Sequence, residues 1–202
     1  MAVGDVAWVE GDHDRAVAQY EEAVELSRGT GDPLLVVTAV YNLGMAAYQG
    51  GRSERARKAF HEALELGRDL HDAPHVAAAQ FMLGHLDVLA GDTRSALEHA
   101  SESYLLYTDL EDARSRARCL VVLAAVAAGD GFTEDAARLL GGAEALRGDD
   151  PPDLFELRTL EQFAGDLEFR LGTAAFGELK IEGRRLEPDA VTRKVVRAGI
   201  EE

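Results

Sequence analysis

The sequence predicts an all-α fold in which helical hairpins of about 40 residues repeat and stack into a right-handed α-solenoid. Three observations support this prediction. Glycines return at intervals of 40 residues, and apolar residues within the segments between them recur at steps of three and four. No stretch alternates apolar and polar residues over any length, as a half-buried β-strand would.

The 40-residue interval holds in several columns of residues. They are the turn glycines Gly11, Gly51, Gly91 and Gly131; the small residues Gly4, Gly44, Gly84 and Ala124; the leucine column Val3, Leu43, Leu83 and Leu123; the alanines Ala16, Ala56, Ala96 and Ala136; and Leu26, Leu66, Leu106 and Leu146. A small residue at a helix crossing lets two backbones approach closely, and a glycine between helices can take a positive φ. A further column, Tyr20, Phe60, Ala100 and Leu140, is expected to fill the space between neighbouring units.

Helix starts repeat with the same interval. Asp32, Asp72 and Asp112 are predicted N-caps, and Ser53, Thr93 and Thr133 are predicted to cap the second helix of each pair. The predicted helices are 13–29, 33–49, 53–70, 73–90, 93–109, 113–129, 133–147, 154–171, 173–185 and 189–197.

Two regions are expected. Residues 1–148 form the repeats, with a truncated first unit that indicates a part of a longer protein. After the loop GDDPPD, with a predicted cap at Asp153, residues 149–202 form divergent helices that close the same solenoid. Repeat arrays need such an atypical terminal unit to cover their last apolar face.

Composition excludes several classes of function. The formal net charge is −16 and the isoelectric point about 4.7, so direct binding to nucleic acid or to an anionic membrane surface is not expected. The single cysteine, Cys119, cannot form an internal disulfide or a thiolate metal site, which indicates a reducing, cytoplasmic setting. No apolar run is long enough to cross a bilayer, and no signal peptide is evident.

Motifs for catalysis are missing from the sequence. It contains no phosphate-binding loop G-x-x-x-x-G-K-[ST], no H-E-x-x-H zinc motif and no G-x-S-x-G nucleophile elbow. His71 and His75 are spaced by four, but Pro74 lies between them, and they are expected to be exposed loop histidines. We therefore predict no catalytic residue, no metal and no cofactor.

A candidate binding surface follows from the first helix of each pair, because these helices line the inner side of such an array. Their inward positions form an aromatic stripe that ends near an arginine: Trp8, Tyr41, Met45, Tyr48, Phe81, His85, Val88, Arg118 and Val121, beside Ala125. Aromatic residues and arginine dominate binding hot spots. The stripe is either a groove for an apolar or aromatic segment, with Arg118 or His85 pairing an acidic end, or a set of side chains that pack between helices or against the tail.

Basic residues gather near the end of the chain. They are Arg184, Arg185, Arg193, Lys194 and Arg197, with acidic residues among them. They either dock onto an acidic neighbouring domain or form an ordinary charged helix surface.

The repeats resemble tetratricopeptide repeats, in a version longer than the standard 34 residues. The tail is more specific: AARLLGGAEALR (136–147), PPD (151–153) and LGTAAFGELKIEGRRLEPDAV (171–191) resemble the C-terminal end of large bacterial multidomain regulators. These regulators, which include LuxR-type and antibiotic-regulator-type activators, join an ATPase domain, a helical repeat region and a DNA-binding domain. The resemblance implies a sensor or interaction arm of such a regulator.

The expected function is therefore binding. The ligand would be a protein, a peptide, another domain of the parent chain or a small inducer, and the truncated first unit would also permit a homodimer. A free-standing scaffold protein and an enzyme on a helical-array fold are the alternatives.

Overall fold

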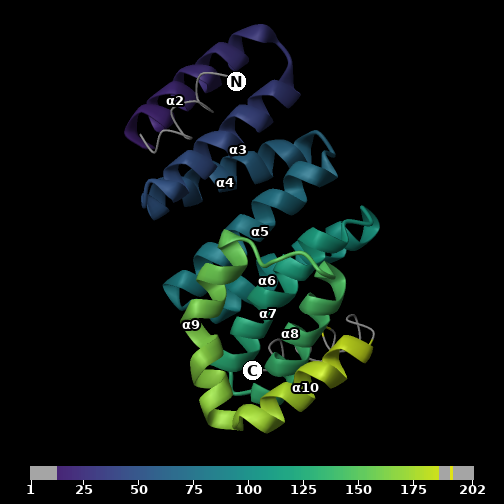
Figure 1. The fold of residues 1–202 in the computed structure, drawn as a ribbon. Coiled ribbons are helices and arrows are strands. Elements are labelled where there is room, and N and C mark those ends of the chain that lie inside the picture. Colours follow the sequence, from purple (N-terminus) through teal and green to yellow (C-terminus); the bar gives the residue numbers. More distant parts are fainter. Residues whose placement is uncertain (1–12, 187–191, 193–202) are drawn as a thin grey trace. The chain divides into compact units, whose positions relative to one another are not determined.

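The computed structural model describes residues 13–186 and residue 192 (Figure 1). Regular structure within this part of the chain is entirely helical, which confirms the predicted all-α fold of repeated helix pairs. The helices are α2 (His13–Thr30), α3 (Pro33–Gln49), α4 (Ser53–Asp69), α5 (Ala73–Ala90), α6 (Thr93–Asp109), α7 (Ala113–Gly129), α8 (Thr133–Arg147), α9 (Leu154–Leu171) and α10 (Thr173–Arg185). Apart from residue 192, the predicted helix 189–197 lies outside the described residues, and the superhelical sense stays a prediction.

The chain divides into two compact units, Met1–Met82 and Leu83–Glu202, and the division falls within α5. The first unit contains α2, α3, α4 and the N-terminal part of α5. The second contains the rest of α5 and helices α6 to α10. This division differs from the predicted boundary between repeats and capping helices at residue 148, which stays a prediction.

Matching helix crossings occur in both units. In the first, a Cβ atom built on Gly44 would lie 2.6 Å from the ring of Phe60, which is fully buried. In the second, a Cβ atom on Gly84 would lie 3.1 Å from the backbone nitrogen of Ala100. Each partner in the second contact stands 40 residues after its counterpart in the first. The predicted role of the small-residue column is thus confirmed at these two crossings, and Ala124, the next member, is fully buried.

The turns repeat twice as often as the helix pairs. Left-handed backbone occurs at Gly51, Gly91 and Gly131, as predicted, with φ of 71°, 77° and 88°. It also occurs midway between them at His71 (φ 54°) and Glu111 (φ 57°), in register with Gly31 at φ 76°. The sequence did not reveal these two positions, because a residue other than glycine gives no signal for positive φ.

Aspartates cap the first helices as predicted. The carboxylate of Asp32 accepts a hydrogen bond from Leu34 N at 3.0 Å, and that of Asp112 accepts one from Ser115 N at 3.0 Å. Such a bond satisfies one of the free amides of the first turn.

The predicted caps of the second helices are wrong by one position. Ser53, Thr93 and Thr133 are the first residues of their helices rather than the residues that cap them. Before α6 the cap is Asp92, which accepts from Ser95 N at 3.1 Å. The aspartate one position earlier can reach the free amides of the first turn, whereas the threonine is already inside the helix. Before α4 and α8 the residue at the cap position makes no side-chain capping bond.

The last two helices do not follow the packing order of the repeats, in which each helix packs on the one before it in the chain. Helix α10 packs along α8, whereas α9 lies mainly against α7 (Figure 1). The α8–α10 crossing is very close: a Cβ atom on Gly141 would lie 2.1 Å from the carbonyl oxygen of Lys180, and one on Gly183 would lie 2.0 Å from that of Arg138. Helix α10 thus covers α8, the last helix of the repeats, whereas the closing of the solenoid by residues 149–202 stays a prediction.

Ion pairs border the same crossing. Arg138 Nε donates to Glu182 at 3.1 Å, and Glu144 accepts from both Lys180 and Arg184. Burial by itself would raise the pKa of Glu144, but the hydrogen bonds from these two cations outweigh it and lower the pKa. Arg184, one of the predicted docking residues, is thus engaged within the chain. Arg193, Lys194 and Arg197 lie outside the described residues.

A glycine pair in α10 tests the close crossing. We expect Gly183→Ala to lower the free energy of unfolding by about 1–3 kcal/mol, because the added methyl group meets a backbone carbonyl that cannot move aside. Gly177→Ala in the same helix is the matched control, since nothing lies within 4 Å of its Cβ position, and it should add about 0.5–1 kcal/mol from helix propensity. Denaturant unfolding monitored by circular dichroism measures both. Equal effects of the two substitutions would contradict the crossing.

Candidate functional site

Helix α9 lies across the inner face of the second unit. It contacts both α7 and the C-terminal part of α5, the first helices of two successive pairs. The ring of His85 on α5 lies at 90° to that of Phe155 on α9, with centroids 5.6 Å apart. On α7, Arg118 Nε donates to Asp153 at 2.5 Å. Two residues predicted to line the groove therefore meet a helix of the same chain.

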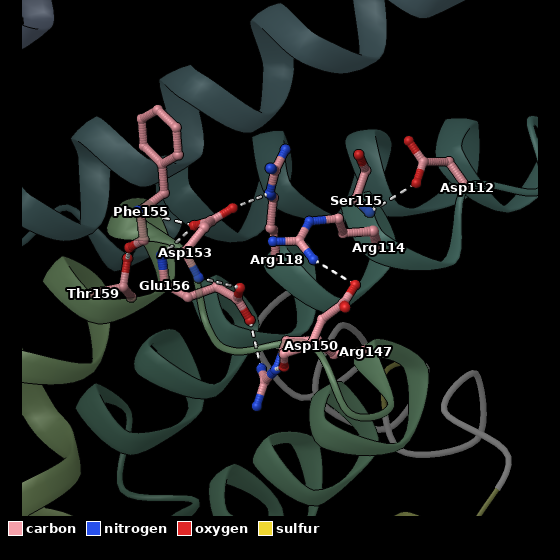
Figure 2. A network of polar contacts seen from close by, with 10 residues as sticks. All are labelled: Asp112, Arg114, Ser115, Arg118, Arg147, Asp150, Asp153, Phe155, Glu156 and Thr159. Carbon is pink, nitrogen blue, oxygen red and sulfur yellow. Dashed lines mark hydrogen bonds and ion pairs between the residues drawn. The ribbon is translucent and has the colours of Figure 1, made fainter.

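The first turn of α9 is held in place by a capping box (Figure 2). One carboxylate oxygen of Asp153 accepts from the backbone amides of Phe155 and Glu156 at 2.9 and 3.0 Å, while the other faces Arg118. The Glu156 carboxylate accepts in return from Asp153 N at 3.0 Å. The predicted cap at Asp153 is confirmed, and its carboxylate joins α9 to α7 as well.

A buried ion pair anchors the same turn to the end of α8. Arg147 donates to Glu156 at 2.7 Å, and the Glu156 side chain is 1% exposed. Arg147 also donates to the carbonyl oxygen of Asp150 at 2.9 Å, and the Asp150 carboxylate accepts from Arg114 at 2.8 Å (Figure 2). The loop between α8 and α9 is thus tied to both α7 and α8 by charged groups.

A neutral histidine lies beneath α9. Thr159 donates its hydroxyl hydrogen to the carbonyl oxygen of Phe155 at 3.0 Å, so its 2.9 Å contact with His85 Nδ1 requires the histidine to donate. The pKa of His85 is lowered to about 4, mainly by burial and also by the positive charge of Arg158, while the negative charge of Asp153 opposes the shift. At neutral pH the imidazole is therefore an uncharged donor.

A cleft of about 430 Å³ remains between α9 and the helix ends beneath it. Its lining combines small apolar residues of α5 and α7 with longer side chains of α9: Val88, Gly91, Thr93, Ala125, Val126, Ala128, Gly129, Gln162, Phe163, Asp166 and Arg170. The predicted groove residue Val88 lines this cleft together with Ala125. The inner face of the second unit thus has a site that α9 fills incompletely.

The first unit carries its own inner face on α3. Tyr41 is partly exposed, and its ring centroid lies 5.5 Å from that of Phe60 and 6.3 Å from that of His75. His75 Nδ1 lies 2.6 Å from the Asp72 carboxylate, and its Nε2 lies 3.3 Å from the Thr38 hydroxyl. The face therefore presents an aromatic ring beside hydrogen-bonding groups.

The side chains of Asp72 and Thr38 on this face also bond to backbone groups. Asp72 precedes α5 and also contacts the amide of His75, and the Thr38 hydroxyl donates to the carbonyl oxygen of Leu34 at 2.9 Å. The hydroxyl proton is thus directed to the backbone and not to the imidazole. His71 is exposed, as predicted, but the prediction for His75 is wrong: it lies within α5 and is partly buried, because Pro74 occupies the first turn and does not interrupt the helix.

Comparison with known proteins identifies the repeats. A tetratricopeptide repeat profile matches residues 1–66 and 35–109, which together span more than half of the chain. The chain belongs to the tetratricopeptide repeat family. No curated protein matches it. Tetratricopeptide repeats are protein-interaction modules, so the coarse prediction of a binding function is supported by family membership.

The remaining predicted groove residues of this tetratricopeptide repeat protein differ in exposure. Tyr48, Phe81 and Val121 are buried, with 6%, 5% and 2% of their surface exposed, whereas Met45 is partly exposed. Trp8 lies outside the described residues. Tyr41 and Met45 are therefore the members of the stripe in the first unit that offer surface to a ligand.

The residues that α9 contributes to the site were not predicted from the sequence. The Asp153 to Glu156 spacing is a readable capping signal, but the sequence gives no indication that Phe155 and Thr159 would lie against His85. Which helix covers an inner face is decided by tertiary packing.

The structure of residues 13–186 meets the requirements of neither a metal site nor a membrane-spanning helix. No group of three or more histidine, cysteine or carboxylate side chains in that part is placed to hold a metal ion. No helix described there has the length and apolar character needed to cross a bilayer.

The buried histidine predicts a pH dependence of stability. Because the pKa of His85 falls from 6.5 to about 4 on folding, its contribution is fully present above pH 6.5 and is lost as the pH falls towards 4. The loss amounts to roughly 3 kcal/mol at 1.36 kcal/mol per unit. Urea unfolding of the wild type and of His85→Asn between pH 7.5 and 4 measures it. We expect the two stability curves to converge as the pH falls, and parallel curves would contradict the buried neutral state.

Proposed function

We propose that this chain is a non-catalytic interaction arm of a multidomain bacterial transcriptional regulator. It binds a segment of another protein, or of another domain of its parent chain, on the inner faces of its first helices. The coarse part of this function, protein interaction, follows from the family.

One observation carries the proposal: the inner face of the second unit is already occupied by a helix. Arg118 pairs with a carboxylate, His85 packs on an aromatic ring and donates a hydrogen bond, and a cleft remains beside them. A surface that binds one helix through a charge, a ring and a hydrogen bond has the chemistry needed to bind another.

Partly exposed groups support a similar role for the first unit. Tyr41 and Met45 offer aromatic and thioether surface on α3, next to the hydrogen-bonding groups of His75 and Thr38. Large, rigid side chains of this kind give much contact area at low entropic cost.

The protonation state of the Cys119 thiol supports a non-catalytic role. Burial raises the pKa of the Cys119 thiol to about 12, so the thiolate that reacts is not formed at neutral pH. The thiol donates to the hydroxyl of Ser103 at 3.3 Å inside the core.

The regulator context is supported by the tail sequence, in which the segments 136–147, 151–153 and 171–191 resemble the end of such regulators. The alternative is a free-standing scaffold. The reading frame that surrounds the coding sequence separates the two, because a regulator requires an ATPase domain in the same frame.

A substitution on α3 tests the binding role. We expect Tyr41→Ala to weaken binding of the cellular partner at least about tenfold, because an aromatic hot spot is removed, while thermal stability changes little. The matched control is Lys58→Ala, an exposed residue of α4 that should leave binding unchanged. Quantitative affinity purification with both variants, followed by titration of the purified partner, measures the effect. A large loss of stability with unchanged affinity per folded molecule would show that Tyr41 belongs to the core.

A further inference from the structure

Helix α9 is attached to the inner face mainly by polar groups. Of its 18 residues, those that are buried are Glu156, Thr159 and Leu167, whereas twelve of the 17 residues of α7 are buried. Phe169 near its C-terminal end is 88% exposed. A helix with so little apolar burial opens at a lower free energy than its neighbours.

The ends of α9 permit it to leave while its neighbours stay in place. It is preceded by the loop 148–153 and followed by Gly172, and Gly148 and Gly172 both have positive φ, at 66° and 79°. Helix α10 is held independently on α8 by the Gly141–Gly183 crossing. Release of α9 therefore does not require α10 to move.

The contacts of α9 define a recognition pattern. A carboxylate at the N-cap position, Asp153, meets Arg118. An aromatic ring two residues later, Phe155, meets His85, and a hydrogen-bond acceptor four residues further, Thr159, meets the same imidazole. The two last groups lie one turn apart on the same side of a helix.

We propose that α9 is a built-in ligand that occupies a docking site for an amphipathic helix of a partner protein. The partner helix begins with a carboxylate that replaces Asp153 and carries an aromatic ring and an acceptor at the same spacing. It also places a large apolar side chain over Val88 and Ala125, where α9 leaves space unfilled. This inference deepens the proposed function, on which it rests, by naming an α-helical protein segment as the ligand of the second unit.

The self-ligand should behave as a competitor. While α9 remains tethered, its effective concentration at the face is in the millimolar range, so a free helix binds weakly to the wild-type chain. A full-length chain in which α9 is weakened should bind the same helix much more tightly.

The probe for the test is a fluorescein-labelled peptide of residues 151–172, titrated by fluorescence anisotropy against full-length chains. We expect the Asp153→Lys chain to bind it at least about tenfold more tightly than the wild type, because the substitution removes both the cap and the ion pair of the tethered α9. Phe155→Asp alone is a second releasing variant, which removes the ring contact with His85 and leaves both Asp153 and Arg118 unchanged. A chain that carries both Phe155→Asp and Arg118→Asp keeps its own α9 mismatched, because Asp153 then faces a carboxylate; it should not bind the native peptide and should bind a peptide that carries Asp153→Lys.

Hydrogen exchange establishes whether α9 is released. We expect α9 amides to exchange about 100-fold faster than those of α7 in the wild type, and faster still in the releasing variants. Protection of α9 equal to that of α7 in every variant would overturn the proposal. So would rapid exchange of α9 in a releasing variant that does not bind the peptide.

Failure of the helix-docking proposal can be distinguished from failure of the proposed function. If the peptide fails to bind while Tyr41→Ala still weakens the cellular partner, α9 is a structural cap and the interaction role stands on the first unit. If the peptide binds while Tyr41→Ala has no effect on the cellular partner, the helix-docking site stands and the role of the first unit is wrong.

Discussion

The fold depends on close contact between the two helices of each pair. Where Gly84 crosses α6, a Cβ atom would lie 3.1 Å from the backbone nitrogen of Ala100, and the corresponding crossing in the first unit sets Gly44 against the ring of Phe60. A crossing this tight fixes which faces of the helices are buried and which are directed inward. The position of the candidate binding residues on α3, α5 and α7 follows from this constraint.

The same kind of contact explains why the end of the array departs from the repeat. Gly141 and Gly183 bring α8 and α10 so close that each glycine meets backbone atoms of the other helix. This contact gives α10 the place beside α8 that a following first helix would take. Helix α9 is then directed across the inner face, where Arg118 and His85 receive it. The terminal glycines thus connect the packing of the cap with the occupation of the site.

Much of the fold could be predicted because it depends on local and periodic features. Helix bounds, the glycine turns and the aspartate caps follow from spacing that a single sequence displays. The left-handed backbone at Glu111 could not be read, because it belongs to the turn that ends α6, where Asp112 N donates to the carbonyl oxygen of Tyr107, and glutamate gives no signal for it. For the site, Arg118 or His85 was expected either to pair an acidic end of a ligand or to pack against the tail, and Arg118 pairs with a carboxylate within the chain. That the carboxylate is Asp153 of the same chain depends on the path of α9, which no local signal specifies.

The most direct measurement of the central constraint is cooperative urea unfolding of Gly84→Leu, with Gly177→Leu as a control of equal size at a helix glycine that has open space. At Gly84 the leucine side chain meets the backbone of α6. We predict that Gly84→Leu lowers the free energy of unfolding by more than about 3 kcal/mol or abolishes cooperativity, whereas the control retains a wild-type transition. A Gly84→Leu chain with the helicity, midpoint and slope of the wild type would contradict the account.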